Sequence, residues 1–127
     1  LFVAGFLGSP SMNFIEGRYT VQDGKAFVAA DDATRLPVPV LEAATEGQQV
    51  VLVFRPEHLA LDPTGVQARV DVVEPTGANI EVFADIAGTE ICAVFSERHA
   101  FTPGETISLG WAQEKVHVFD KETGQRI

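Results

Sequence analysis

The pattern of apolar and polar residues changes near the start of the chain. Residues 1–14 are mostly apolar or small, and they break at Gly8, Ser9 and Pro10. This pattern predicts a short helix that ends in a turn. From residue 18 onward, apolar and polar positions alternate in short runs, as is typical of strands with one buried face. The sequence therefore predicts a short helical segment followed by a series of strands.

Two of the strands are predicted by a turn signal. Residues 18–22 and residues 26–29 flank an Asp-Gly pair at residues 23–24, which is a strong signal for a β-hairpin. A third strand is predicted from the apolar run at residues 49–54. It is expected to end at Pro56, because proline has no N–H group to donate to a neighbouring strand.

The remaining segments alternate between strands and loops. Residues 30–45 contain prolines, acids and small residues, so we expect a loop with a short edge strand at residues 38–41. Further strands are predicted at residues 66–72, 80–86, 91–95, 106–111 and 115–119, with turns at residues 74–77 and 87–90. Several short strands joined by turns indicate a small closed barrel or sandwich, so the predicted fold class is all-β.

Length and charge exclude several classes of protein. The 127 residues are enough for one compact domain with its own core. Nine Lys and Arg against eighteen Asp and Glu give a net charge of −9, and the basic residues are scattered singly, which opposes nucleic-acid binding. The longest apolar run, residues 1–7, is too short to cross a bilayer. Because the chain begins with Leu1, we expect it to have been cut from a longer one.

Patterns of catalytic or metal-binding residues are absent from the sequence. Cys92 is the one cysteine and lies in an apolar strand, so we expect a small buried side chain and no disulfide. Glu57 beside His58 leaves an acid–base or metal site open as an alternative, but the histidines lack ligand spacing. Gly24-Lys25 is followed by Ala26 and does not form a phosphate-binding loop. We therefore expect no catalysis, no cofactor and no metal in this chain.

Three motifs in a fixed order carry a family resemblance. The motifs are Phe2-Val3-Ala4-Gly5-Phe6-Leu7-Gly8-Ser9-Pro10 continuing through Met12, Asn13 and Phe14; Arg55-Pro56-Glu57-His58-Leu59; and His117, Phe119, Asp120, Thr123, Gly124 and Arg126 near the end. Together they resemble the C-terminal regulatory region of the ATP-binding subunit of maltose- and glycerol-phosphate-type sugar ABC importers. That region is a transport-associated OB-like barrel, the TOBE domain.

The resemblance implies both an organisation and a function. Residues 1–14 would be a connector from an absent nucleotide-binding domain, which would hold ATP and Mg, and residues 15–127 would be the TOBE or OB-like regulatory domain. The parent subunit would be an ATPase that works as a homodimer beneath a permease, at the cytoplasmic inner face of the cell membrane. This region would tether the two ATPase domains, and a regulatory protein is a further partner in some members of the family.

Residue roles follow in the same way. Arg55 and Glu57 are expected to form hydrogen bonds or an ion pair that stabilises the barrel where Pro56 ends a strand, with His58 completing the structural motif. Trp111 is expected to face the core and Phe119 to be partly exposed at the end of a strand. The candidates for contact with a second copy or a regulator are Glu74, Gly77, Asn79 and Phe119. The alternative is that these four are ordinary turn and core residues.

A rival function belongs to a different class. Related transport-associated barrels bind oxyanions such as molybdate between barrels, so the chain could be a small-ligand module. The acidic charge argues against this function, because an oxyanion site needs converging donors. Arg18, Lys25 and Arg35 are among the few basic residues available, and the sequence does not bring them together.

Overall fold

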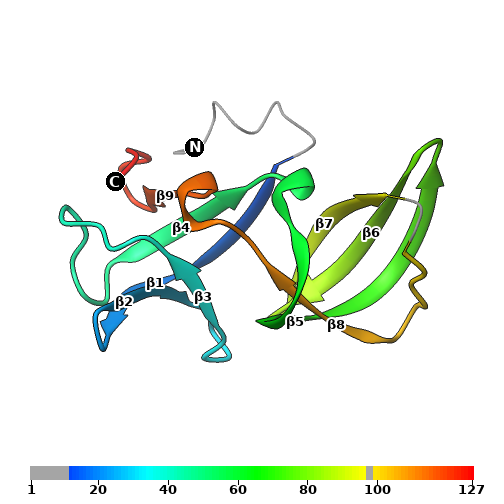
Figure 1. Ribbon diagram of the computed structural model, residues 1–127. Coiled ribbons are helices and arrows are strands. Elements are labelled where there is room, and N and C mark those ends of the chain that lie inside the picture. The colour runs from blue at the N-terminus through cyan, green and yellow to red at the C-terminus, as the bar shows by residue number, and fades with distance from the viewer. Residues whose placement is uncertain (1–11, 97–98) are drawn as a thin grey trace. The chain divides into compact units, whose positions relative to one another are not determined.

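The computed structural model describes residues 12–96 and 99–127 (Figure 1). These residues form two compact units, which we call the first unit (residues 12–54 and 112–127) and the second unit (residues 55–96 and 99–111). Each unit contains one antiparallel sheet and one short 3-10 helix. The all-β class is thereby confirmed. A regulatory domain over residues 15–127 remains a prediction.

Five strands build the sheet of the first unit. They are β1 (Asn13–Gln22), β2 (Lys25–Ala29), β3 (Arg35–Val38), β4 (Gln49–Phe54) and β9 (His117–Asp120), and the 3-10 helix η2 (Gln113–Lys115) precedes β9. Their order in the sheet is β3-β2-β1-β4-β9, with every pair antiparallel. The chain thus returns from the second unit to place its last strand beside β4.

Three of the first predicted strands are present, although β1 begins earlier than predicted, and a fourth is misplaced. The β1–β2 hairpin turns at Asp23 and Gly24, which have φ angles of 52° and 78°, and β4 has the predicted bounds. The edge strand expected at residues 38–41 is β3 at Arg35–Val38 instead. Pro37 lies inside β3, in register with Phe27. A proline is tolerated there because β3 pairs on one side only.

The sheet of the first unit buries apolar side chains on both of its faces. All of β4 after Gln49 is buried, because its continuous apolar run serves both faces. Gly17 of β1 allows close packing against β2, since a Cβ atom there would lie 2.5 Å from the Ala29 carbonyl oxygen. The fully buried side chains include Ile15, Tyr19, Val28, Leu36, Val50 and Leu52.

Four strands build the sheet of the second unit. They are β5 (Ala60–Thr76), β6 (Asn79–Ile86), β7 (Thr89–Ser96) and β8 (Thr106–Gly110), in the order β7-β6-β5-β8, and the 3-10 helix η1 (Pro56–His58) precedes β5. The turn expected at residues 74–77 is wrong in position, because β5 continues to Thr76 and the turn falls at Gly77. Pro75 does not end β5, since there β5 pairs with β6 and no longer with β8.

The two faces of the second sheet differ in burial. The buried face carries Val66, Ala68, Val70, Val82, Ala84, Ile86, Ile91, Ala93 and Leu109. On the opposite face, Phe83, Cys92 and Val94 are half-buried and Val72 is exposed. The expectation of a buried Cys92 is therefore wrong, because Ile91 and Ala93 take the buried face and alternation turns Cys92 outward. Trp111 is half-buried at the end of β8.

Most of the predicted connector lies outside the described residues. The structure describes residues 12–14 of it, and Asn13 and Phe14 belong to β1. The connector role of residues 1–14 and its helix remain predictions.

Candidate functional site

The Arg-Pro-Glu-His motif forms the short helix η1 at the start of the second unit. Pro56 is buried at its first position, where the missing N–H is not needed. The expected ion pair is present, with Arg55 Nη1 3.8 Å from Glu57 Oε2, and about half of each side chain is exposed. An exposed ion pair of this kind contributes at most about 1 kcal/mol to the free energy of unfolding. We therefore attribute the stability of η1 chiefly to Pro56 and to the contact of η1 with β7.

His58 does not gather ligands for a metal. Among residues 12–96 and 99–127, no group of three or more His, Cys, Asp or Glu side chains lies close enough to hold a metal ion. The Nδ1 atom of His58 is buried and has no hydrogen-bond partner in the described part of the chain. The side chain is thus placed by packing rather than by a neighbouring carboxylate.

The motif near the C-terminus builds a turn around one carboxylate. Asp120 Oδ1 accepts hydrogen bonds from the backbone N–H groups of Glu122 and Thr123, both at 2.8 Å. The Thr123 hydroxyl accepts from the N–H of Gln125, and Gly124 has a φ angle of 74°. The bond from Thr123, followed by that from Gln48, holds the pKa of Asp120 below its ordinary value of 3.8. These motif residues therefore hold the C-terminal segment against β9.

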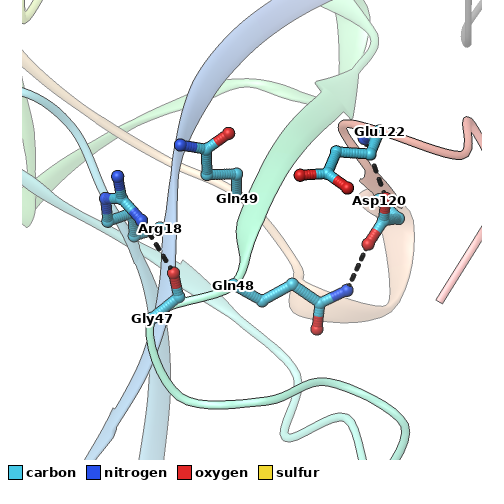
Figure 2. A pocket seen from close by; sticks show the side chains of 6 residues that line it. All are labelled: Arg18, Gly47, Gln48, Gln49, Asp120 and Glu122. Atoms are coloured by element: carbon cyan, nitrogen blue, oxygen red, sulfur yellow. Dashed lines mark hydrogen bonds between the residues drawn. The ribbon is translucent and has the colours of Figure 1, made fainter.

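A hollow of about 340 Å³ opens beside this turn, within the first unit (Figure 2). Figure 2 shows Arg18 on one side and Asp120 and Glu122 on the other. Arg18 Nη1 donates to the Gly47 carbonyl oxygen at 3.0 Å, and Gln48 Nε2 donates to Asp120 Oδ2 at 2.5 Å. Arg18 and Gln48 are therefore engaged by protein acceptors, and the carboxylates oppose the binding of an anion.

The long loop before β4 is held by β1. The buried Tyr19 hydroxyl accepts a hydrogen bond from the N–H of Leu41 at 2.9 Å. Glu46 accepts from the Thr20 hydroxyl at 2.6 Å and from the N–H of Val21 at 3.0 Å. These two bonds, in that order, lower the pKa of Glu46 from its ordinary value of 4.5. No pattern in the sequence predicts these long-range contacts.

The structure brings three of the four predicted contact residues together. Glu74 and Asn79 lie on the two strands of the β5–β6 hairpin, and Gly77 forms its turn with a φ angle of 67°. Phe119 lies in the first unit and is 8% exposed, packed against a cluster that includes Met12 and Val51. The expectation that Phe119 is partly exposed is wrong, because β9 is covered at this position. Contact roles for the hairpin residues stay predictions.

One face of the second unit carries a pattern that the sequence analysis missed. On the outer face of β5, β6 and β7, the register aligns an apolar row of Val72, Phe83 and Cys92. Glu74 and Glu81 lie directly opposite each other on one side of this row, and Asp85 and Glu90 do so on the other. We call this surface the acid-flanked face. Alternation along single strands showed half-buried faces, but only the register reveals the like-charge pairs.

The acids affect the one thiol on this face. Burial, and then the negative charges of Glu81, Glu74 and Glu90, raise the pKa of Cys92 to about 11. A thiol with this pKa is almost entirely protonated at neutral pH and is a weak nucleophile. Burial is the largest cause of this shift in pKa, and the three carboxylates add to it.

Taken together, these features define an all-β module whose carboxylates either close turns or face outward. A family model of the TOBE domain matches residues 52–119, and a model of the MalK OB fold domain matches residues 8–59. The chain belongs to the TOBE domain family. The resemblance inferred from the three motifs is confirmed.

Relatives agree with this family. The chain is 39% identical over its whole length to an uncharacterized ABC transporter ATP-binding protein of Sinorhizobium fredii. It is 36% identical, over 99% of its length, to the sn-glycerol-3-phosphate import ATP-binding protein UgpC 2 of Agrobacterium fabrum. In both cases the match covers 34% of the relative, so the chain spans about a third of their length.

A solved structure supports the fold. The chain is similar to the cytoplasmic molybdate-binding protein ModG in a crystal form with molybdate bound, with a TM-score of 0.67. The match covers 84% of this chain and 94% of that chain at 20% sequence identity. At this identity the similarity shows the OB-like fold alone. In the described part of this chain, no helix is long and apolar enough to cross a membrane.

Proposed function

We propose that this chain is the regulatory region of the ATP-binding subunit of an ABC importer for a sugar or sugar phosphate. The observation that carries the proposal is the combined match to the TOBE and MalK OB fold families and to ATP-binding proteins of ABC transporters. ATP and Mg would bind elsewhere in the parent subunit. The subunit would work beneath a permease at the cytoplasmic face of the membrane.

The role we propose for this region is to tether two ATPase domains. When hydrolysis separates two motor domains, a second contact keeps them at an effective concentration on the order of millimolar, so closure need not wait for diffusion. A weak contact is sufficient for this purpose.

Self-association of the chain is the property that tests the tether. Two copies with a net charge of −9 each repel one another, so salt should strengthen their contact by screening the charge. Light scattering over a wide concentration range, at about 50 mM and about 500 mM NaCl, measures both effects. We expect the average mass to rise with concentration, and more at high salt. A strict monomer under both conditions would contradict the proposal.

The predicted contact at the hairpin can be tested with a matched pair of variants. Asn79→Arg changes an exposed amide at the start of β6, and Gln113→Arg makes the same change in η2 of the first unit. Both substitutions alter the net charge equally. If the hairpin makes the contact, Asn79→Arg weakens self-association and Gln113→Arg does not. Equal effects would place the contact elsewhere.

The oxyanion function gains little support. The similarity to ModG is one of fold, and the hollow beside Arg18 is lined by Asp120 and Glu122, which oppose anions. Titration calorimetry with molybdate, tungstate and sulfate distinguishes the two functions. We expect no heat of binding at micromolar ligand, and a measurable heat would favour the oxyanion function.

A further inference from the structure

The acid-flanked face is organised in four rows across β5, β6 and β7. From the hairpin turn inward, the rows are Thr76–Asn79–Ser96, Glu74–Glu81–Val94, Val72–Phe83–Cys92 and Arg69–Asp85–Glu90. The apolar row therefore lies between two rows that each contain a pair of directly opposed carboxylates. Val72 is 47% exposed, so the apolar row reaches the surface.

The opposed carboxylates destabilise the sheet of the free protein locally. Like charges directly opposite each other on neighbouring strands destabilise a sheet. Arg69 lies opposite Asp85, whereas Glu81 faces Glu74 on one side and Val94 on the other, and Glu90 faces Asp85 alone. Nothing in the register compensates Glu74, Glu81 or Glu90. A cation placed between the strands from outside would relieve this repulsion and cover the apolar row.

We propose that the acid-flanked face binds a protein partner that presents an apolar side chain between lysine or arginine side chains. The apolar row supplies the centre of the contact, and the carboxylates supply its polar rim, as in other protein interfaces. Charge complementarity identifies the partner, since oppositely charged patches attract and like-charged patches repel. The partner differs from the second copy of this chain that the proposed function requires.

Charge also excludes two other occupants of this face. A second copy would bring Glu74, Glu81 and Glu90 against the same residues, so self-contact through this face is opposed by repulsion. Phosphate-bearing partners, such as a nucleic acid or an anionic membrane surface, are repelled by the same carboxylates. A self-contact at the hairpin turn, around Gly77 and Asn79, remains compatible with a different partner on the face.

A synthetic peptide of matching chemistry serves as the probe. The peptide acetyl-Lys-Ser-Phe-Ser-Lys-amide, when extended, presents Phe between two Lys side chains on one face, and the control peptide has Glu in place of each Lys. Calorimetry with the full chain measures binding, and amide chemical shifts locate it. We expect the cationic peptide to bind, with shifts centred on Val72, Phe83 and Cys92, and the acidic peptide not to bind.

Matched variants separate a specific face from simple charge attraction. Glu81→Gln with Glu90→Gln removes one acid from each opposed pair, and Glu114→Gln with Glu122→Gln removes the same charge from exposed positions of the first unit. We expect the first double variant to bind about tenfold more weakly and the second to change by less than about twofold. Val72→Thr keeps the branched shape but should weaken binding through the lost apolar contact.

Three results would overturn the proposal: no binding of the cationic peptide, equal weakening by the two double variants, or shifts centred on the first unit. Circular dichroism of each variant confirms folding, and removing a like charge from the sheet should not unfold it. The outcome is independent of the tether. A chain that is a strict monomer in light scattering can still bind the peptide, and a chain that self-associates can fail to bind it.

Discussion

Carboxylates serve different purposes in the first unit and on the acid-flanked face of the second. In the first unit, Glu46 and Asp120 each accept hydrogen bonds from at least two groups, and both hold loops against the sheet. On the acid-flanked face, the side chains of Glu74 and Glu81 lie directly opposite each other, and that of Glu90 lies opposite Asp85. The comparison separates acids that maintain the fold from acids that are available to a partner.

The same distinction appears in the direction of the pKa shifts. Hydrogen bonds lower the pKa of Glu46 and of Asp120, because they stabilise the charged form. On the acid-flanked face the shift of Cys92 is upward, because burial and neighbouring negative charges favour the neutral thiol. The second unit also uses acids in turns, since Asp62 accepts from the N–H and hydroxyl of Thr64. The contrast therefore concerns the outer face, rather than the whole unit.

The largest expected effect concerns the reactivity of Cys92. With a pKa near 11 in place of the ordinary 9.0, its thiolate fraction at pH 8 is about 100-fold lower than that of an ordinary cysteine. The rate of alkylation by iodoacetamide as a function of pH gives this pKa directly. Glu81→Gln should lower the pKa, whereas Glu114→Gln, in the first unit, should not. An ordinary pKa for Cys92 would contradict the crowding of acids on this face.

Removal of one hydroxyl in the first unit should have the next largest effect. Tyr19→Phe leaves the N–H of Leu41 without its acceptor, and the hydroxyl belongs to a buried side chain. We expect a loss of about 1–2 kcal/mol in the free energy of unfolding, measured by urea denaturation. Substitution of the neighbouring exposed Val21 by Ala should cost less than about 0.5 kcal/mol. Equal losses would show that the loop is not held by this bond.

Acid should weaken the first unit through its bonded carboxylates. A folded-state pKa below the ordinary value means that the group stabilises the fold above that value, and that this stability is lost as the pH falls through the folded-state pKa. For Glu46 and Asp120 the ordinary values are 4.5 and 3.8, so the loss begins near these values and continues below them. Urea denaturation as a function of pH measures it. The double variant Glu46→Gln with Asp120→Asn should show a flatter profile.

The smallest expected effect is a gain of stability on the acid-flanked face. Glu81→Gln removes the repulsion with Glu74 on the opposite strand. We expect the free energy of unfolding to rise by a few tenths of a kcal/mol, which thermal denaturation detects as a small increase in Tm. A clear decrease would mean that Glu81 has a structural role that the register does not show.

The sequence predicts local features of the fold well. The Asp23-Gly24 turn and the bounds of β4 are both correct, because a turn with positive φ and a strand ended by Pro56 depend on neighbouring residues alone. Errors occur where pairing with a neighbouring strand decides whether a residue lies in a strand or in a loop. Pro37 and Pro75 predict a loop and a turn, but both lie in strands that pair on one side at that point.

The candidate site is less predictable because it depends on pairing. Alternation marks Val72, Phe83 and Cys92 as members of separate strands, and only the register places them in one row. The continuous apolar run at residues 91–95 has no alternation and therefore predicts a buried Cys92, whereas the position of Phe119 at the end of a strand predicts partial exposure. Contacts such as that of Glu46 with Thr20 join residues far apart in sequence, and composition does not predict them.

The most direct test of the two uses of carboxylates is a measurement of unfolding free energy on a matched pair. Asp120→Asn weakens the bonds that close the turn after β9, whereas Glu81→Gln removes an opposed charge from the acid-flanked face. Both remove one negative charge and keep the shape of the side chain. Urea denaturation at pH 7 should show a loss of stability for Asp120→Asn and a small gain for Glu81→Gln. Changes of the same sign would contradict the account.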